Sequence, residues 1–259
     1  MKIDEFKSPN GWQEFCDFIL RTNRYVLNST WADFINTVLS SAKKRETILG
    51  KGTKLVRARI GSHYDEREEK NGEWRIITGP LQPEELMAPP PKKAKDARIN
   101  PRGISYLYLS NLEKTAISEV RPWIGQNVSV GYFKIQKELK CIDTSRDMKM
   151  PFFFWNQEKS KLTPKEKEEY VWGGINNSFS RPIRSEDETI NYIPTQYLSE
   201  IFKDNGYDGI IYKSALAEKG NNIVLFNPKN AQLQAARVFQ INSIEPIFEE
   251  CDNPYTCKK

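Results

Sequence analysis

The sequence predicts an α+β domain that follows a small N-terminal helical segment. Short strand patterns and amphipathic helix patterns are mixed along the chain, without the strict alternation that a parallel α/β sheet requires. Hydrophobic residues make up 38% of the 259 residues and aromatic residues 12%, which suffices for a packed core and argues against a disordered chain. This mixture of elements indicates the α+β class.

The N-terminal segment is expected to contain two helices. Apolar side chains recur at helical spacing in two runs, one beginning at Trp12 and the other at Trp31, so both helices should lie within residues 11–47. Ser29 or Thr30 is the expected N-cap of the second helix, since a hydroxyl there can accept a hydrogen bond from the first turn.

The segment Gly50-Lys-Gly52 ends the helical pattern and marks the expected domain boundary. We divide the chain into an accessory segment over residues 1–50, a main domain over residues 51–250 and a tail over residues 251–259. Within the main domain, alternation and apolar runs predict strands at 54–60, 106–110, 127–135, 207–214 and 222–226, with one more inside 237–248.

Three helices are expected between these strands. Asn111 should cap the first, and the capping box Thr163-Pro-Lys-Glu166 should begin the second. The third should run from Thr195 to a stop at Asn205-Gly206. Residues 61–97 are predicted to form a mostly polar loop that ends in a stiff, proline-rich connector.

Composition and missing motifs exclude several functions. The chain has no G-x-G-x-x-G and no G-x-x-x-x-G-K-[ST], so neither a Rossmann dehydrogenase nor a P-loop enzyme is supported. None of the four cysteines forms a C-x-x-C pair and His63 is the single histidine, so no metal site is expected.

The chain also shows no signal core and no run long enough to span a membrane, so we expect a cytoplasmic protein with reduced thiols. The net charge of +5 suits a phosphate-bearing ligand but is too small to favour nucleic-acid binding.

Any nucleotide must therefore be held by side chains, and arginine suits that task. Its planar fork binds phosphate oxygens through two hydrogen bonds. Arg57 on the first main-domain strand and Arg98 before the second are the candidates, with surface salt bridges as the alternative for each. Arg59 competes with Arg57, because alternation places both on the same face of the strand.

Arg98, Tyr108 and Glu119 follow one another at spacings of ten and eleven residues, across an expected loop, strand and helix. A carboxylate such as Glu119 can stabilise the positive charge that develops on a ribose when an N-glycosidic bond breaks. Tyr108 could stack on nicotinamide, and the Ser214 hydroxyl could reach a carboxamide or a phosphate. The alternatives are an exposed helical glutamate, a core tyrosine and a turn serine.

Taken in order, these residues resemble a known family. The pattern consists of Arg57, Arg98-Ile-Asn100, Tyr108-Leu-Ser110, Thr115-Ala-x-x-Glu119, Gly206-Tyr-Asp-Gly-Ile-Ile-Tyr-Lys-Ser214 and Asn222-Ile-Val-Leu-Phe226. It is similar to the RES domain, which is named for its arginine, glutamate and serine, and the resemblance covers roughly residues 53–245.

The resemblance implies an ADP-ribosyltransferase-like fold, with a mixed β core and flanking helices. It also implies a bacterial toxin that degrades NAD by hydrolysis or phosphorolysis at the nicotinamide–ribose bond, without a metal, and that is paired with an Xre-type antitoxin. By the resemblance of the motifs, the two family arginines match Arg57 and Arg98. The family tyrosine, glutamate and serine match Tyr108, Glu119 and Ser214. Asn100 and Tyr212, which lie inside the motifs, are expected to help bind NAD.

Three features depart from the family pattern. Ile99 stands where the family often has tryptophan. Residues 1–50 add helices, and residues 140–190 resemble an insertion. Finally, a long loop separates Arg57 from Arg98. The added helices are candidates for binding a partner, for dimerisation or for shielding the site.

We therefore predict an NAD-cleaving enzyme that acts as a growth-inhibiting toxin or a phage-defence effector. Arg57 and Arg98 should bind the diphosphate, while Tyr108 orients the ribose, Glu119 stabilises charge and Ser214 bonds near the nicotinamide or its phosphate. Water or inorganic phosphate should then capture the ribosyl carbon. The alternatives are transfer of ADP-ribose to a protein or nucleic acid, and a non-enzymatic interaction module.

Overall fold

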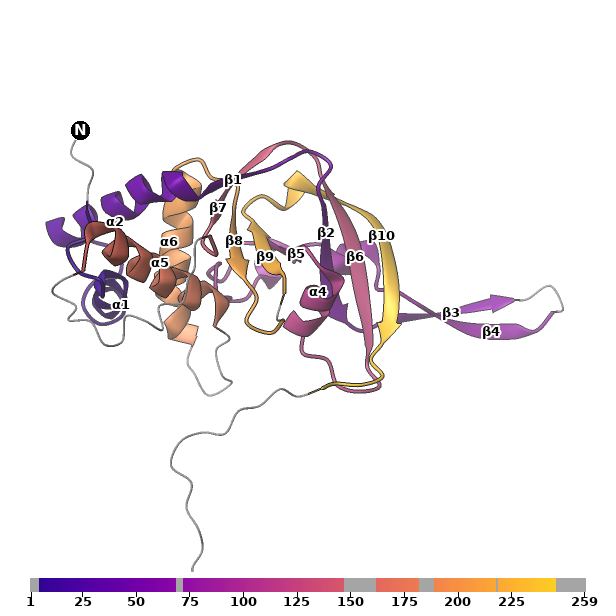
Figure 1. The fold of residues 1–259 in the computed structure, drawn as a ribbon. Coiled ribbons are helices and arrows are strands. Elements are labelled where there is room, and N and C mark those ends of the chain that lie inside the picture. The colour runs from indigo at the N-terminus through magenta and orange to yellow at the C-terminus, as the bar shows by residue number, and fades with distance from the viewer. Residues whose placement is uncertain (1–4, 69–71, 147–161, 182–188, 218, 246–259) are drawn as a thin grey trace, which may run out of the picture.

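A computed structural model describes the chain except residues 1–4, 69–71, 147–161, 182–188, 218 and 246–259. A mixed sheet forms its centre, a group of helices covers one end, and a two-stranded hairpin projects from the other (Figure 1).

The strands are β1 (Glu46–Leu49), β2 (Lys54–Ile60), β3 (His63–Glu68), β4 (Trp74–Gly79), β5 (Leu107–Ser110), β6 (Asn127–Ile135), β7 (Leu139–Asp143), β8 (Gly209–Lys213), β9 (Asn221–Leu225) and β10 (Ala231–Gln240). The α-helices are α1 (Gly11–Arg21), α2 (Ser29–Ala42), α3 (Pro83–Leu86), α4 (Glu113–Glu119), α5 (Pro164–Ser180) and α6 (Ile193–Asp204). Short 3-10 turns lie at Lys43–Arg45, Pro91–Lys93, Thr189–Tyr192 and Pro228–Asn230.

Eight strands form one sheet in the order β1-β7-β8-β9-β5-β2-β6-β10. Neighbours are antiparallel except β7 and β8, which pair in parallel. The predicted strands at 54–60, 106–110, 127–135, 207–214 and 222–226 correspond to β2, β5, β6, β8 and β9. The mixed sheet with interspersed helices confirms the predicted α+β class.

Helices α1, α2, α5 and α6 form one layer on the sheet (Figure 1). Their apolar faces share a single core with sheet residues, and fully buried members of this core include Phe15, Val38, Trp172, Phe202, Ile210 and Val224. Strand β1 precedes the expected boundary at residue 50 and pairs with β7, so the N-terminal segment contributes to the main sheet as well as to this core. The division into an accessory segment, a main domain and a tail stays a prediction, and the tail lies outside the described residues.

Helix α4 covers another part of the sheet. Ala116 packs against Val56 and Ala58 of β2 and against Val128 and Val130 of β6. A third buried cluster, including Leu107, Phe133 and Ile223, fills the opposite side of the strands. The sheet is therefore packed on both faces, and α4 stands apart from the larger helical layer.

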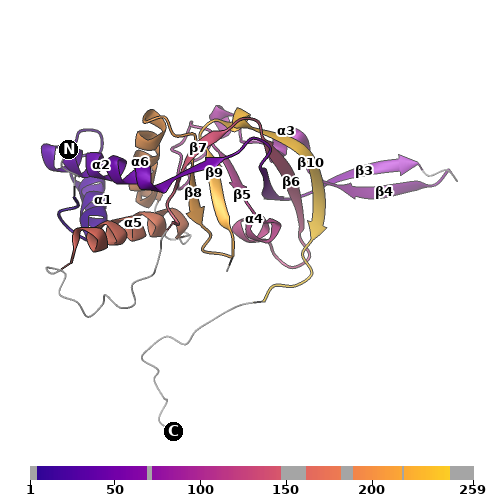
Figure 2. The same ribbon diagram turned by 45° about the horizontal axis from the view of Figure 1, so that its top comes forward.

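The prediction of a polar loop over residues 61–97 was wrong in part. Within it, strands β3 and β4 pair as a hairpin that projects away from the sheet (Figures 1 and 2). The last four residues of β3 are charged and both of its faces meet solvent, so the alternation by which a half-buried strand is recognised is missing.

The region 140–190, which resembles an insertion, contributes to the fold. Strand β7 lies between β1 and β8 in the sheet, and α5 supplies the buried Trp172 and Phe179 to the main core. The last strand, β10, begins at Ala231, earlier than the expected 237–248.

The structure confirms the predicted N-terminal cap of α5 and corrects the predicted caps of α2 and α4. Thr163 and Glu166 form the predicted reciprocal capping box of α5. Asn28, and not Ser29 or Thr30, caps α2 by accepting a hydrogen bond from the Trp31 amide. Helix α4 begins after Leu112, because the Asn111 side chain instead accepts a hydrogen bond from the Asn221 amide.

Candidate active site

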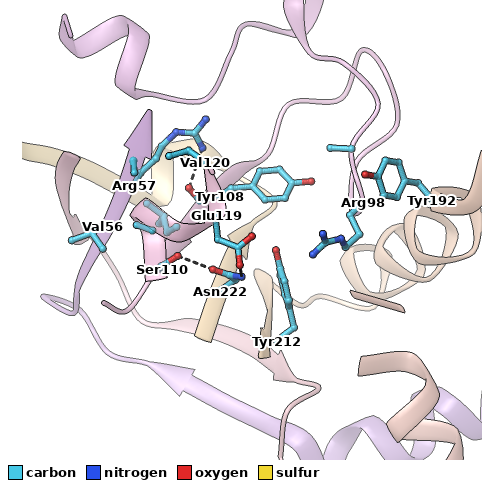
Figure 3. Close-up of a pocket in the computed structure, with 14 residues that line it drawn as sticks. Val56, Arg57, Arg98, Tyr108, Ser110, Glu119, Val120, Tyr192, Tyr212 and Asn222 are labelled. Carbon is cyan, nitrogen blue, oxygen red and sulfur yellow. Dashed lines mark hydrogen bonds between the residues drawn. The ribbon is translucent and has the colours of Figure 1, made fainter. Parts of the chain in front are cut away.

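A cleft of about 290 Å³ opens on the sheet between α4 and the helical layer. Its lining includes Arg57, Arg98, Tyr108, Glu119, Tyr192 and Tyr212 (Figure 3). Five of the seven residues predicted for NAD binding or catalysis thus meet at one place. Asn100 and Ser214 are not among the lining residues.

The floor of the cleft is a row of directly paired residues on four neighbouring strands. Val56 of β2 is opposite Ser110 of β5, Ser110 is opposite Asn222 of β9, and Asn222 is opposite Tyr212 of β8. Residues that pair directly across strands point to the same face of a sheet. The sheet register therefore brings a hydroxyl, an amide and a phenol into one line beneath the cleft.

Glu119 is the last residue of α4 and reaches over this row (Figure 3). Its Oε1 atom accepts a hydrogen bond of 2.6 Å from Asn222 Nδ2 and one of 2.7 Å from Ser214 Oγ. Neither donor carries a formal charge, so the carboxylate is oriented without a salt bridge among the described residues. Its other oxygen, Oε2, has no hydrogen-bond partner within the described part of the chain.

Arg98 lies on the other side of the cleft. Its Nη1 atom donates to the carbonyls of Phe179 and Ser180, at 2.6 and 3.2 Å, where α5 ends. The final carbonyls of a helix lack intrahelical partners and carry partial negative charge, so they suit a guanidinium. The guanidinium also lies 5.9 Å from the centre of the Tyr212 ring, and its buried Nε has no partner among the described residues.

The structure distinguishes Arg57 from Arg59. Arg57 lines the cleft and donates to the Tyr108 carbonyl at 3.0 Å, whereas Arg59 donates to the Met87 carbonyl and is not among the lining residues. Burial, and next the charge of Arg59, lower the pKa of Arg57 to about 10. Its Nε is buried without a hydrogen-bond partner among the described residues.

Tyr108 presents its ring to the cleft, while its hydroxyl is already engaged (Figure 3). The hydroxyl donates to Asn100 Oδ1 at 2.7 Å and accepts from the Ile99 amide at 3.3 Å. Burial, and next the nearby Tyr212, raise the pKa of Tyr108 well above its usual value, so the phenol stays neutral.

Asn100 supports the loop and does not face the cleft. Its amide nitrogen contacts three backbone carbonyls, those of Lys95, Pro101 and Ile104. Its oxygen receives the Tyr108 hydroxyl. These contacts hold the loop that carries Arg98, and a role of Asn100 in NAD binding stays a prediction.

Ser214 is buried behind Glu119, and its hydroxyl donates to that carboxylate. Tyr212 lies on the cleft floor, and burial raises the pKa of its phenol, with Arg98 opposing and Glu119 reinforcing the shift. Both residues were predicted, but the placement of Ser214 points to a role through Glu119 and not through direct contact with a ligand.

Three polar lining residues were not among the predicted site residues. Asn222 and Ser110 lay inside recognised motifs without an assigned role, and the strand pairing that joins them is not visible in a sequence. Tyr192 enters from the turn before α6, in a region without a recognisable pattern.

A larger cavity of about 820 Å³ lies around the start of α4 and the neighbouring strands β2 and β6. Lys54, Lys114 and Lys134 contribute to its lining, and the predicted site residues do not. The smaller cleft is therefore the candidate active site, since it gathers the reactive groups.

Within the described residues, no group of three histidine, cysteine or acidic side chains could hold a metal ion. None of the described helices has the length and apolar character needed to cross a membrane.

The chain belongs to the RES domain family, whose sequence profile matches residues 73–245. This range includes Arg98, Tyr108, Glu119 and Ser214, whereas Arg57 precedes it. A search of curated proteins found no match. Among solved structures, the chain is similar to a chain of the MbcT–MbcA toxin–antitoxin complex of M. tuberculosis, with 12% identity, a TM-score of 0.44, and coverage of 78% of this chain and 92% of that chain.

Proposed function

We propose that this RES-family protein cleaves the bond between nicotinamide and ribose in NAD. The observation that supports this most is the convergence of Arg98, Tyr108 and Glu119 on one cleft, in a chain without any other nucleotide-binding motif. The cleft volume of about 290 Å³ lies just below the usual range of ligand pockets, about 300 to 1,000 Å³. It suits the nicotinamide ribose end of a dinucleotide.

In the proposed reaction, the bond between nicotinamide N1 and ribose C1′ breaks. Its electron pair stays on N1 and neutralises the pyridinium, while C1′ gains positive charge. An oxygen of water or inorganic phosphate then bonds to C1′. With water the products are nicotinamide, ADP-ribose and a proton, and with phosphate they are nicotinamide and ADP-ribose 1″-phosphate.

Each side chain has a proposed part in this reaction. Glu119 Oε2, which has no hydrogen-bond partner among the described residues, accepts a hydrogen bond from a ribose hydroxyl and stabilises the charge on the sugar ring. Arg98 and Arg57, each held to backbone carbonyls through Nη1, bind phosphate oxygens through the rest of the guanidinium. The neutral Tyr108 and Tyr212 rings provide flat apolar surfaces for the nicotinamide ribose.

The test is to incubate purified protein with NAD and follow free nicotinamide, with and without inorganic phosphate. We expect release by the wild-type protein in at least one condition, and identification of the ribose product separates hydrolysis from phosphorolysis. NAD labelled on its adenylate half covers the nearest alternative, because label retained on a protein or nucleic acid would indicate ADP-ribosyl transfer. No release in any condition would refute cleavage.

We further propose that this activity inhibits growth and that a protein antitoxin of the Xre type restrains it, as the family resemblance implies. Expression of the chain alone should lower cellular NAD and stop growth, and co-expression of a neighbouring helix-turn-helix protein should restore both. A Glu119→Ala variant that folds and keeps full toxicity would instead support a non-enzymatic interaction module.

A further inference from the structure

We infer that Asn222, oriented by Ser110, is a positioning residue that fixes one oxygen of the Glu119 carboxylate and leaves the other to the substrate. This inference rests on the proposed function for its consequence in catalysis. Its structural part, the control of Glu119 by an amide and a hydroxyl, can be tested without NAD.

The geometry defines a chain of hydrogen bonds along the cleft floor. Ser110 Oγ lies 2.7 Å from Asn222 Oδ1, and Asn222 Nδ2 lies 2.6 Å from Glu119 Oε1 (Figure 3). Ser110 and Asn222 are direct cross-strand partners and are only 3% exposed each. The strand register therefore places both groups, and neither depends on a flexible loop.

The chemistry of the groups fixes the direction of this chain. A carboxylate only accepts hydrogen bonds, so the NH₂ group of Asn222 must face Glu119 and its oxygen must face Ser110. Among the described residues, Ser110 then has one acceptor for its proton, the Asn222 oxygen. With the hydroxyl absent, the amide would lose the contact that holds this orientation.

The result is an asymmetric carboxylate. Oε1 receives two donors, Asn222 Nδ2 and Ser214 Oγ, while Oε2 receives none from the described residues. Two short donors on one oxygen restrict rotation of the carboxylate plane and direct the second oxygen into the cleft. A preorganised group of this kind does not have to reorient as charge develops on the substrate.

The first experiment replaces Asn222 with aspartate and follows carboxyl titration by NMR, with ¹³C-labelled glutamate and aspartate side chains. Asn222→Asp puts a second carboxylate next to Glu119, and two adjacent carboxylates cannot both ionise easily. We expect a carboxyl group in this variant that titrates at least one pH unit higher than any carboxyl group in the wild-type cleft. Tyr212 also faces Glu119, but its raised pKa keeps it neutral over this range, and the Arg98 charge is unchanged.

Asn221→Asp is the matched control. It adds the same charge one residue earlier on β9, where alternation directs the side chain to the opposite face. We expect no high-pH carboxyl titration in this control. A titration curve of Asn222→Asp that matches wild type would overturn the inference, whether or not the protein cleaves NAD.

The second experiment uses Ser110→Ala and Ser110→Thr with nicotinamide release as the readout. Loss of one hydrogen bond should lower kcat about five- to tenfold with little change in KM, and threonine should restore kcat because it keeps the hydroxyl. An unchanged kcat in Ser110→Ala, with an active wild type, would contradict the positioning role of Ser110 and Asn222 but would leave the proposed function intact. An inactive wild type would refute the proposed function, and the titration would then decide the positioning inference.

Discussion

The two sides of the cleft are held in different ways. The carboxylate side consists of Glu119 with its donors Asn222 and Ser214, and the sheet positions it through side-chain hydrogen bonds. The arginine side consists of Arg98, and the carbonyls at the end of α5 position it.

This difference determines what each side depends on. The carboxylate side lies within one small set of paired strands and the short helix α4. The arginine side depends on α5, which lies about eighty residues further along the chain. Helix α5 is in turn bound to α1, because Trp12 Nε1 donates a hydrogen bond to Ser178 Oγ at 2.8 Å. The N-terminal helices thus reach the cleft through packing, although they contribute none of its lining residues.

The largest effect is expected on the carboxylate side. Glu119→Gln keeps the shape of the side chain but removes its charge, so the developing ribosyl cation loses its main stabilisation. We expect nicotinamide release to fall by about 10²- to 10³-fold, as for loss of one preorganised stabilising group. Glu113→Gln, on the same helix but bonded to Tyr132, is the matched control and should stay active. Comparable rates for the two variants would remove Glu119 from catalysis.

Arg98→Lys tests the arginine side. Lysine keeps the charge but lacks the planar fork that contacts the helix end while leaving donors for a phosphate. We expect kcat/KM for NAD to fall by about 10- to 100-fold, mainly through KM. Arg102→Lys, in the same loop but exposed, should behave as wild type. An Arg98→Lys variant with an unchanged KM would contradict phosphate binding by this residue.

Trp12→Phe asks whether the two sides depend differently on the N-terminal helices. The substitution removes the hydrogen bond to Ser178 and some buried volume, and should lower the free energy of unfolding by about 1–2 kcal/mol. We expect a two- to threefold rise in KM, since α5 carries the carbonyls that hold Arg98. In a double variant, the rise in KM from Trp12→Phe should not add to the rise from Arg98→Lys. Full additivity of the two effects on KM would contradict the proposed link from Trp12 through α5 to Arg98.

The smallest effect concerns alkaline stability. Burial raises the pKa of Tyr108, so above about pH 10 the unfolded chain loses this proton while the folded protein keeps it. Stability should therefore fall as pH rises above 10. Tyr108→Phe should flatten that fall by up to about 1.4 kcal/mol per pH unit in urea unfolding. Tyr64→Phe, exposed on the projecting hairpin, is the control for loss of a hydroxyl, and equal slopes in both variants would refute the assignment.

The sequence predicted the strands that have a buried face and missed the elements that lack one or that lie in an unrecognised region. Strands β2, β5, β6, β8 and β9 have one or both faces buried, so their apolar patterns were visible in the sequence. The β3–β4 hairpin lacks such a face, and β7 and α5 contribute to the core from a region that resembles an insertion. The polar sequence of the β3–β4 hairpin hides it from pattern analysis. The position of β7 between β1 and β8 becomes clear only from the order of strands in the sheet.

Among site residues, sequence motifs located Arg98, Tyr108, Glu119 and Tyr212, which line the cleft. The motifs could not show that the Asn100 side chain faces the loop or that Ser214 lies behind Glu119. A motif identifies a residue but does not say where its side chain points. The role of Asn222 depends on its partner across the strands, and the anchoring of Arg98 depends on Phe179 and Ser180. Such partners follow from tertiary packing and not from spacing.

The most direct measurement is a crystal structure of the Glu119→Gln variant with intact NAD. The account predicts that the nicotinamide ribose lies in the cleft, with a ribose hydroxyl within hydrogen-bond distance of the side chain at position 119 and a phosphate oxygen within reach of Arg98. NAD bound elsewhere, for example in the larger cavity beside Lys114, with the cleft empty, would contradict it.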